Sequence, residues 1–131
     1  MLKKTIKYED YNGNTLEEDF YFNLTKAEIA QMELEVPGGM SATLERITKA
    51  QDTPALISIF QDLILRSYGV KSDDGKRFIK NAQMREEFSQ HAAYSVLFME
   101  LATNAEAASE FVNGIIPAEL SGKLKELENK Q

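Results

Sequence analysis

An Asn-Gly pair near the start of the chain constrains the fold more than any other short feature. Asn12-Gly13 lies between two segments in which apolar and polar side chains alternate. This dipeptide, flanked by such segments, is the strongest short-range signal of a β-hairpin. We therefore predict strand, turn and strand over residues 2–24. Because side chains alternate between the two faces of a strand, the pairing register decides which of them are buried.

Two loop lengths are compatible with this pair, and they give opposite registers. A two-residue loop pairs Tyr8 with Glu17, which places a carboxylate on the apolar face. A three-residue loop over 11–13, with Gly13 in the left-handed conformation, instead pairs Tyr8 with Leu16. We predict the second register because it keeps the carboxylates off the apolar face. Its other pairs are Leu2 with Phe22, Lys7 with Glu17 and Thr5 with Asp19.

The second strand of this hairpin carries an aromatic face. Phe20 and Phe22 lie on the same side as Leu16 and Leu24, with Glu18 interrupting the stripe. A two-stranded hairpin alone is marginally stable in water, so this face must be covered. Either the chain's own helices cover it, or an exposed edge recruits a strand from a partner. Phe20 and Phe22 are therefore candidate partner-binding residues.

From residue 25 onward the pattern becomes helical. Thr25 and Glu28 form a capping box, which predicts a helix to about Glu35. Pro37-Gly38-Gly39 ends that helix in a tight turn. Further helices are predicted over about 41–50, from Pro54 to Tyr68, from Asn81, over 92–103 and from Asn104 to Gly114. A left-handed Gly69 is expected to end the second of these. The helix that begins at Asn81 should turn Met84 and Phe88 inward.

These elements predict an α+β protein that is predominantly α-helical. The N-terminal β-hairpin occupies about 2–24, and five to seven short helices form a body over 25–117. A charged C-terminal tail follows over 118–131. A length of 131 residues predicts a single domain.

The segment 92–103 is apolar on nearly all sides, unlike the other predicted helices. Such a helix is either central to the core or is buried by a partner as well. Four methionines could contribute to an adaptable apolar groove, and for Met84 and Met99 filling of the core is the favoured interpretation; they are Met32, Met40, Met84 and Met99.

Basic side chains concentrate after a turn over 72–75. Lys76, Arg77 and Lys80 form a positive patch in a chain whose formal charge is −6. This patch is either a solvated loop or a surface that docks onto an acidic partner, including a second copy of the chain. Lys76, Arg77 and Lys80 are therefore the remaining candidate partner-binding residues.

No pattern of catalytic, cofactor-binding or metal-ligating residues is found. The chain has no cysteine, and His91 is its one histidine, so neither a metal site nor a catalytic triad is indicated. Asp73 and Asp74 lack the spacing of a calcium loop. The acidic charge disfavours nucleic acid, and no apolar stretch approaches the roughly 20 residues that span a bilayer. We therefore expect a protein that is not an enzyme and needs no cofactor.

Several short sequence segments of the chain occur together in one group of proteins. They are Tyr68-Gly69 with Lys71-Ser72, Asp74-Gly75-Lys76-Arg77-Phe78-Ile79-Lys80, Ala93-Tyr94-Ser95, Leu97-Phe98-Met99-Glu100-Leu101-Ala102-Thr103, Phe111-Val112-Asn113-Gly114-Ile115-Ile116-Pro117, Asp10-Tyr11-Asn12-Gly13-Asn14 and Glu18-Asp19-Phe20-Tyr21-Phe22-Asn23-Leu24. The chain resembles small phage and prophage proteins that are tail assembly chaperones of long-tailed phages.

The resemblance implies a function and a place of action. Such a chaperone is not an enzyme; it binds the tape measure protein and helps recruit the major tail protein during assembly of the tail tube. It works in the host cell cytoplasm and is absent from the mature virion. Self-association through the basic residues is a further expectation. The alternative is a structural virion component, such as a tail or head-completion protein.

Overall fold

The computed structural model describes residues 1–35 and 53–117. Three predictions lie outside the described residues: the turn at 37–39, the helix at 41–50 and the tail over 118–131. The described residues contain strands and helices in the order β1, β2, α1, α3, β3, β4, α4, α5, α6. The mixed α+β class predicted from the sequence is therefore confirmed.

The N-terminal hairpin has the predicted register. Strand β1 (Leu2–Glu9) pairs antiparallel with β2 (Thr15–Phe22), and Tyr8 lies opposite Leu16. Gly13 has a φ of +83°, so the left-handed loop residue is also confirmed. The Asp10 carboxylate holds the turn, because its Oδ1 accepts hydrogen bonds of 2.9 Å from the backbone N–H groups of both Asn12 and Asn14.

Glu18 is accommodated on the apolar face of the hairpin by a hydrogen bond. The Tyr8 hydroxyl donates to its carboxylate from the neighbouring strand. This bond, together with burial and the negative charge of Glu18, raises the pKa of Tyr8 to about 12. The carboxylate therefore has a partner inside a stripe that is otherwise apolar.

A second hairpin extends the sheet within the region predicted to be helical. Strands β3 (Tyr68–Lys71) and β4 (Phe78–Ile79) give a four-stranded antiparallel order β1-β2-β3-β4. Helix α3 (Thr53–Ser67) passes directly into β3. The prediction of Gly69 as a left-handed helix end is wrong, because its φ is not positive. Pairing of Gly69 with Tyr21 of β2 draws the chain into the sheet instead.

Gly69 is required by close packing rather than by its backbone angles. A Cβ at this position would lie 2.7 Å from Phe78 Cε2 and 2.9 Å from the Ile79 carbonyl oxygen. At Gly114 a Cβ would lie 2.8 Å from Leu2 Cδ1, the end of a flexible side chain. The backbone oxygen beside Gly69 cannot move without disturbing the pairing of β3 with β4.

We expect Gly69→Ala to lower the free energy of unfolding by about 1–3 kcal/mol, the usual cost of an overpacked site. Gly114→Ala is the matched control and should cost less, because Leu2 can change rotamer. Urea denaturation of both variants measures the difference. Equal losses would show that the close approach at β4 is not what constrains residue 69.

Four more helices are described, and three of them, α1, α4 and α6, begin at the predicted caps. They are α1 (Lys26–Glu35), α4 (Ala82–Ser89), α5 (Ala92–Thr103) and α6 (Ala105–Ile115). The capping box is formed, with Thr25 Oγ1 accepting from the Glu28 N–H and Glu28 Oε1 accepting from the Thr25 N–H. Asn81 and Asn104 cap α4 and α6 as predicted.

His91 caps α5, a role that the sequence pattern did not indicate. Its Nδ1 accepts a 3.0 Å hydrogen bond from the Ala93 N–H. The imidazole ring also packs against the rings of Tyr8 and Phe20, with centroid distances of 5.1 and 5.4 Å. The histidine therefore separates α4 from α5 and closes the core at that turn.

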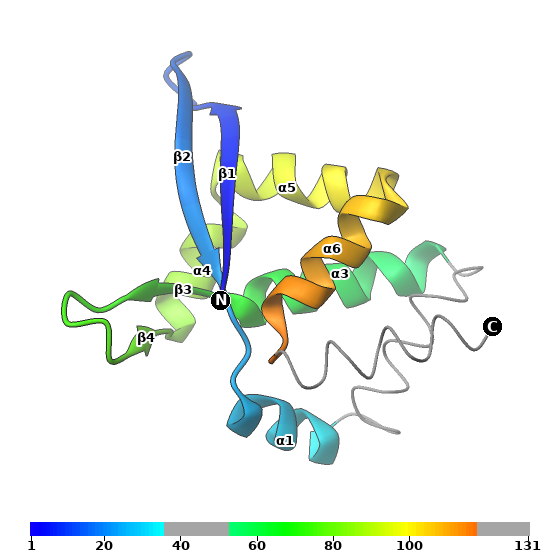
Figure 1. Ribbon diagram of the computed structural model, residues 1–131. Coiled ribbons are helices and arrows are strands. Elements are labelled where there is room, and N and C mark those ends of the chain that lie inside the picture. Colours follow the sequence, from blue (N-terminus) through cyan, green and yellow to red (C-terminus); the bar gives the residue numbers. More distant parts are fainter. Residues whose placement is uncertain (36–52, 118–131) are drawn as a thin grey trace.

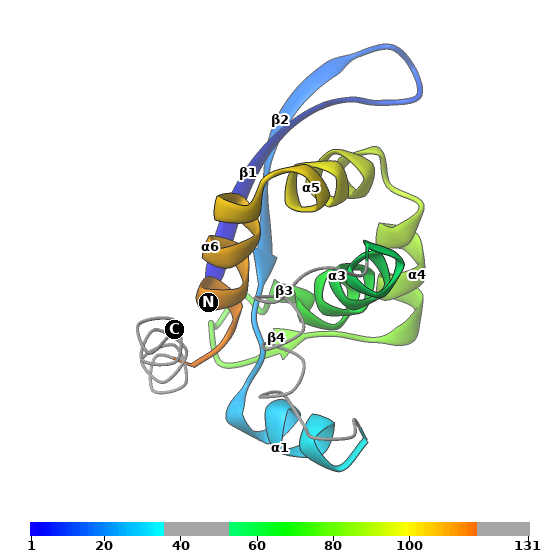
Figure 2. The ribbon, with the colours of Figure 1, turned by 90° about the vertical axis from the view of Figure 1, so that its right-hand side faces the viewer.

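The core lies between the hairpin and the helices. Figures 1 and 2 show α5 and α6 beside the β1–β2 hairpin, and α3 below α5, which it contacts. Helix α1 lies at the bottom, and in Figure 1 the β3–β4 hairpin projects to the left. Phe22 is at the centre, with its ring centroid 5.9 Å from that of Phe88 and 5.4 Å from that of Phe111. Tyr68 stacks on Phe88 at 4.0 Å.

Candidate partner-binding site

The two aromatic candidates of the hairpin lie in the core. Phe22 is 0% exposed and Phe20 is 9% exposed. The Phe20 ring packs against Phe88 of α4 and against His91, at centroid distances of 5.6 and 5.4 Å. The chain's own helices thus cover the aromatic face, which is the first of the two coverings considered. Neither ring presents a surface to a partner in this structure.

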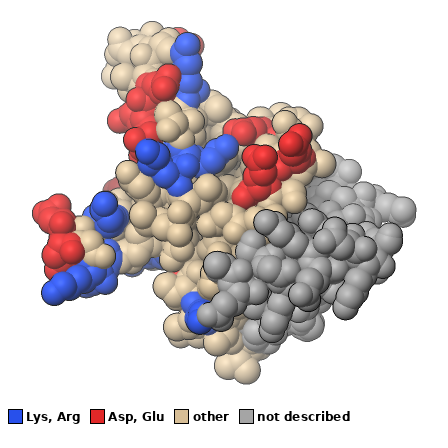
Figure 3. Space-filling model, in the orientation of Figure 1, with Lys and Arg blue, Asp and Glu red and all other residues tan. Residues whose placement is uncertain are grey.

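The three basic candidates do not form one patch. Lys76 and Arg77 are exposed on the β3–β4 hairpin, next to the exposed carboxylates of Asp73 and Asp74. Figure 3 accordingly shows positive and negative side chains together on this projection. Lys80 is half-buried elsewhere and donates 2.6 Å hydrogen bonds to Glu28 Oε2 and to the Asn23 carbonyl oxygen. Its environment is therefore that of a structural residue.

The stability that the contact between Lys80 and Glu28 contributes depends on pH. Partial burial would raise the pKa of the Glu28 carboxyl, but the hydrogen bonds from Lys80 and from the Thr25 N–H outweigh it, and the pKa lies below the ordinary 4.5. Stability from this contact is fully present above that ordinary value. It is lost as the pH falls through the lowered pKa, because the unfolded chain takes up the proton first.

We expect Lys80→Met to lower the free energy of unfolding by about 1.5–3 kcal/mol, because a charged hydrogen bond is removed and two acceptors lose their donor. Lys76→Met is the matched control and should change stability by less than about 0.5 kcal/mol, because its side chain is exposed. Thermal denaturation at neutral pH measures both. Similar values for the two variants would contradict the structural role of Lys80.

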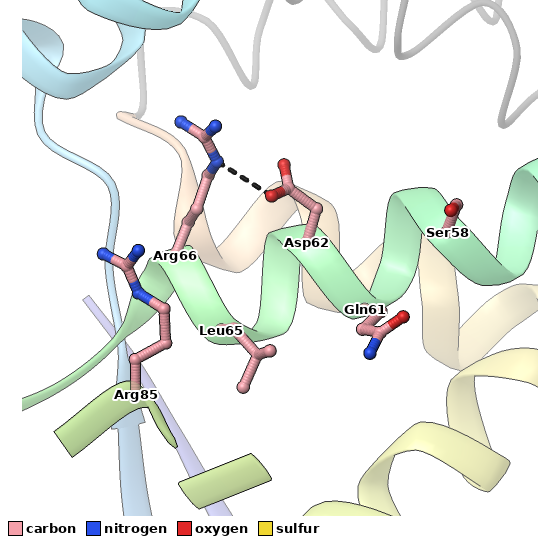
Figure 4. Close-up of a pocket in the computed structure, with 6 residues that line it drawn as sticks. All are labelled: Ser58, Gln61, Asp62, Leu65, Arg66 and Arg85. Atoms are coloured by element: carbon pink, nitrogen blue, oxygen red, sulfur yellow. Dashed lines mark hydrogen bonds and ion pairs between the residues drawn. The ribbon is translucent and has the colours of Figure 1, made fainter. Parts of the chain in front are cut away.

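A shallow hollow lies between α3 and α4 (Figure 4). Its volume is about 350 Å³, and its lining consists of Ser58, Gln61, Asp62, Leu65, Arg66 and Arg85. Arg66 binds Asp62 at 2.9 Å and Glu35 at 3.1 Å, which holds its guanidinium in place beside that of Arg85. Among the described residues that line it, Asp62 supplies the one carboxylate and there is no histidine. These side chains offer polar contacts to a ligand.

Within residues 1–35 and 53–117, no three His, Cys, Asp or Glu side chains come together as metal ligands would. No helix in the same ranges is long and apolar enough to cross a membrane.

The strongest candidate surface is on α5. Ala93, Leu97 and Leu101 are buried on its inner side. The opposite side is exposed and carries no charged residue; we call it the α5 outer face, and it comprises Ser95, Val96, Met99, Ala102 and Thr103. Val96 is 41% exposed and Met99 is 54% exposed. Figures 1 and 2 both show α5 as the uppermost helix, with its outer side turned away from α3.

This arrangement excludes one of the two interpretations of the segment 92–103, that of a helix enclosed on all sides by the core. The helix is not surrounded by the protein, because one side packs on β1 and α3 and the other faces solvent. The favoured placement of Met99 in the core is wrong, because Met99 is 54% exposed. Of the described methionines, Met32 is buried, at 3% exposed, and Met84 is half-buried. Tertiary packing, which a periodicity pattern does not contain, decides which methionine is buried.

Among the described residues, the α5 outer face is thus an exposed helix surface without charged side chains. A family model described as phage tail assembly chaperone matches residues 1–131, the whole chain. The chain therefore belongs to the phage tail assembly chaperone family. No curated protein and no solved structure matches it.

Proposed function

We propose that this chain is a non-enzymatic chaperone that binds the tape measure protein and assists assembly of the tail tube. The observation that supports binding is the α5 outer face, where exposed Val96 and Met99 stand on a helix surface free of charge. Exposed apolar side chains gathered on one helix face are a common feature of surfaces that bind other proteins. Met99 adds an adaptable contact, since its unbranched side chain fills irregular gaps.

The proposed partners are proteins. The major tail protein is the second expected partner. The proposed site of action is the host cell cytoplasm, and the chaperone is released before the virion is complete. Neither nucleic acid nor membrane is included, because a formal charge of −6 opposes binding to phosphate groups. Weak self-association through Lys76 and Arg77 is compatible with their exposure on the β3–β4 hairpin.

Co-expression tests the proposal. The tape measure protein encoded by the same genome is produced alone and together with this chain, and its soluble fraction is measured after centrifugation. We expect most of it to be insoluble alone and soluble with the chain. An unchanged soluble fraction would contradict the proposed function. Mass spectrometry of purified particles tests the alternative, since a structural virion component would be present in every particle and a chaperone would be missing.

A further inference from the structure

Acidic side chains collect at one end of the α5 outer face. Glu100 is four residues after Val96, so the two are neighbours on the helix surface. Glu106 and Glu110 follow on the exposed side of α6, directly after α5 ends. Figure 3 shows this negative group where α5 meets α6.

These glutamates differ in how far they are neutralised. Glu100 forms a 3.1 Å ion pair with Lys4 of β1. Glu106 and Glu110 are exposed, and no ion pair of either is found among the described residues. The surface therefore combines an uncharged strip with a negative end.

We propose that the α5 outer face binds an amphipathic helix that is apolar along one side and carries Lys or Arg at the end beside Glu106 and Glu110. This inference rests on the proposed function for its biological setting. The 12 residues of α5 correspond to about 18 Å of helix, or roughly three turns of the partner. The small side chains of Ser95 and Ala102 beside Met99 provide the grooves into which ridges of a second helix pack.

Two other occupants fit this surface less well. A strand gains little here, because the backbone groups of α5 are hydrogen-bonded within the helix and offer it no ladder. A second copy that packed through its own α5 outer face would bring an uncharged strip and no basic end, so it would gain no charge complementarity with Glu106 and Glu110. A basic helix gains both apolar burial and charge complementarity.

The test uses two synthetic helical peptides of about 18 residues with the same Leu-Ala apolar side. One carries three Lys at its end, and the other carries three Glu at the same positions. Each is titrated into the isotope-labelled full chain, and backbone NMR shifts are followed. We expect the Lys peptide to shift signals of Val96, Met99 and Ala102, and to bind at least tenfold more tightly than the Glu peptide.

Two valine variants provide the matched comparison. Val96→Glu on α5 should weaken binding of the Lys peptide at least tenfold. Val70→Glu on β3 should leave it unchanged, because Val70 is 46% exposed and lies outside the proposed surface. Both variants change the net charge equally. Equal affinity for the two peptides, shifts confined to other elements, or equal effects of the two variants would each overturn the proposal.

Self-association is a separate outcome of the same experiment. If sedimentation shows a dimer that Val96→Glu dissociates and Val70→Glu does not, a second copy occupies the surface and the proposal is overturned. The peptide titration does not depend on the tape measure protein. If co-expression contradicts the proposed function, the titration still tests separately whether the α5 outer face binds a basic amphipathic helix.

Discussion

Phe22→Ala should lower the free energy of unfolding by about 3–5 kcal/mol, the usual cost of truncating a buried phenylalanine. Phe22 is 0% exposed and joins β2 to the helices on both sides of the core. Its ring lies 5.4 Å from that of Phe111 and 5.9 Å from those of Tyr68 and Phe88. The small alanine side chain leaves a cavity where these three rings meet, and a rigid sheet cannot collapse into it.

Tyr11→Ala is the control for this variant. Tyr11 is 87% exposed at the tip of the same hairpin, so its loss should change stability by less than about 0.5 kcal/mol. Urea denaturation followed by circular dichroism gives both values. A loss below about 1 kcal/mol for Phe22→Ala would mean that the aromatic face of the hairpin is not packed on the chain's own helices.

Combining Val96→Glu with Met99→Glu should abolish the effect of the chain on tape measure solubility. The two carboxylates would have to enter an apolar contact without partners, and such burial costs several kcal/mol. In the free protein both side chains are exposed, 41% and 54%. The variant should therefore fold normally, with its stability changed by less than about 0.5 kcal/mol.

A second double variant separates this effect from that of added charge. Val70→Glu with Tyr11→Glu also places two carboxylates at exposed apolar positions, 46% and 87% exposed, on other elements. It should keep the tape measure protein soluble in co-expression as the unaltered chain does. Loss of solubility with both double variants would show that net charge, and not the α5 outer face, governs the interaction.

Local sequence patterns were sufficient for the first hairpin and for the helix starts. The loop at Gly13 and the pairing of Tyr8 with Leu16 follow from side chains close to one another in sequence. The caps at Thr25, Asn81 and Asn104 likewise depend on contacts within three residues. These interactions join residues that are close together in the chain, so the local sequence is enough to predict them.

Contacts between distant segments decided what the sequence could not show. Strand β3 exists because Tyr68 and Gly69 pair with β2, more than forty residues earlier in the chain. The requirement for glycine at 69 arises from β4, which packs against it. A glycine after a helical pattern is read as a helix end when only the local sequence is considered. The local sequence likewise places Lys80 in a surface patch, whereas its ion pair with Glu28 holds it half-buried against α1.

The α5 outer face was not among the partner-binding candidates predicted from the sequence. The segment 92–103 is apolar on nearly all sides, which was compatible with a helix central to the core or with one that a partner buries as well. Which side faces solvent depends on β1 and α3, which pack on Leu97 and its neighbours. For Phe20 and Phe22 of the hairpin, the alternation of side chains correctly predicted a shared face. The helices cover that face, so these two candidates are buried, whereas the α5 outer face is exposed.

Photo-cross-linking from α5 tests most directly that this face contacts the tape measure protein. A photoreactive amino acid is placed at position 99, or at position 70 as the control, and each chain is co-expressed with the tape measure protein. Illumination followed by electrophoresis detects the covalent product. We predict a cross-link to the tape measure protein from position 99 and none from position 70. No product from position 99, or equal products from both positions, would contradict binding through the α5 outer face.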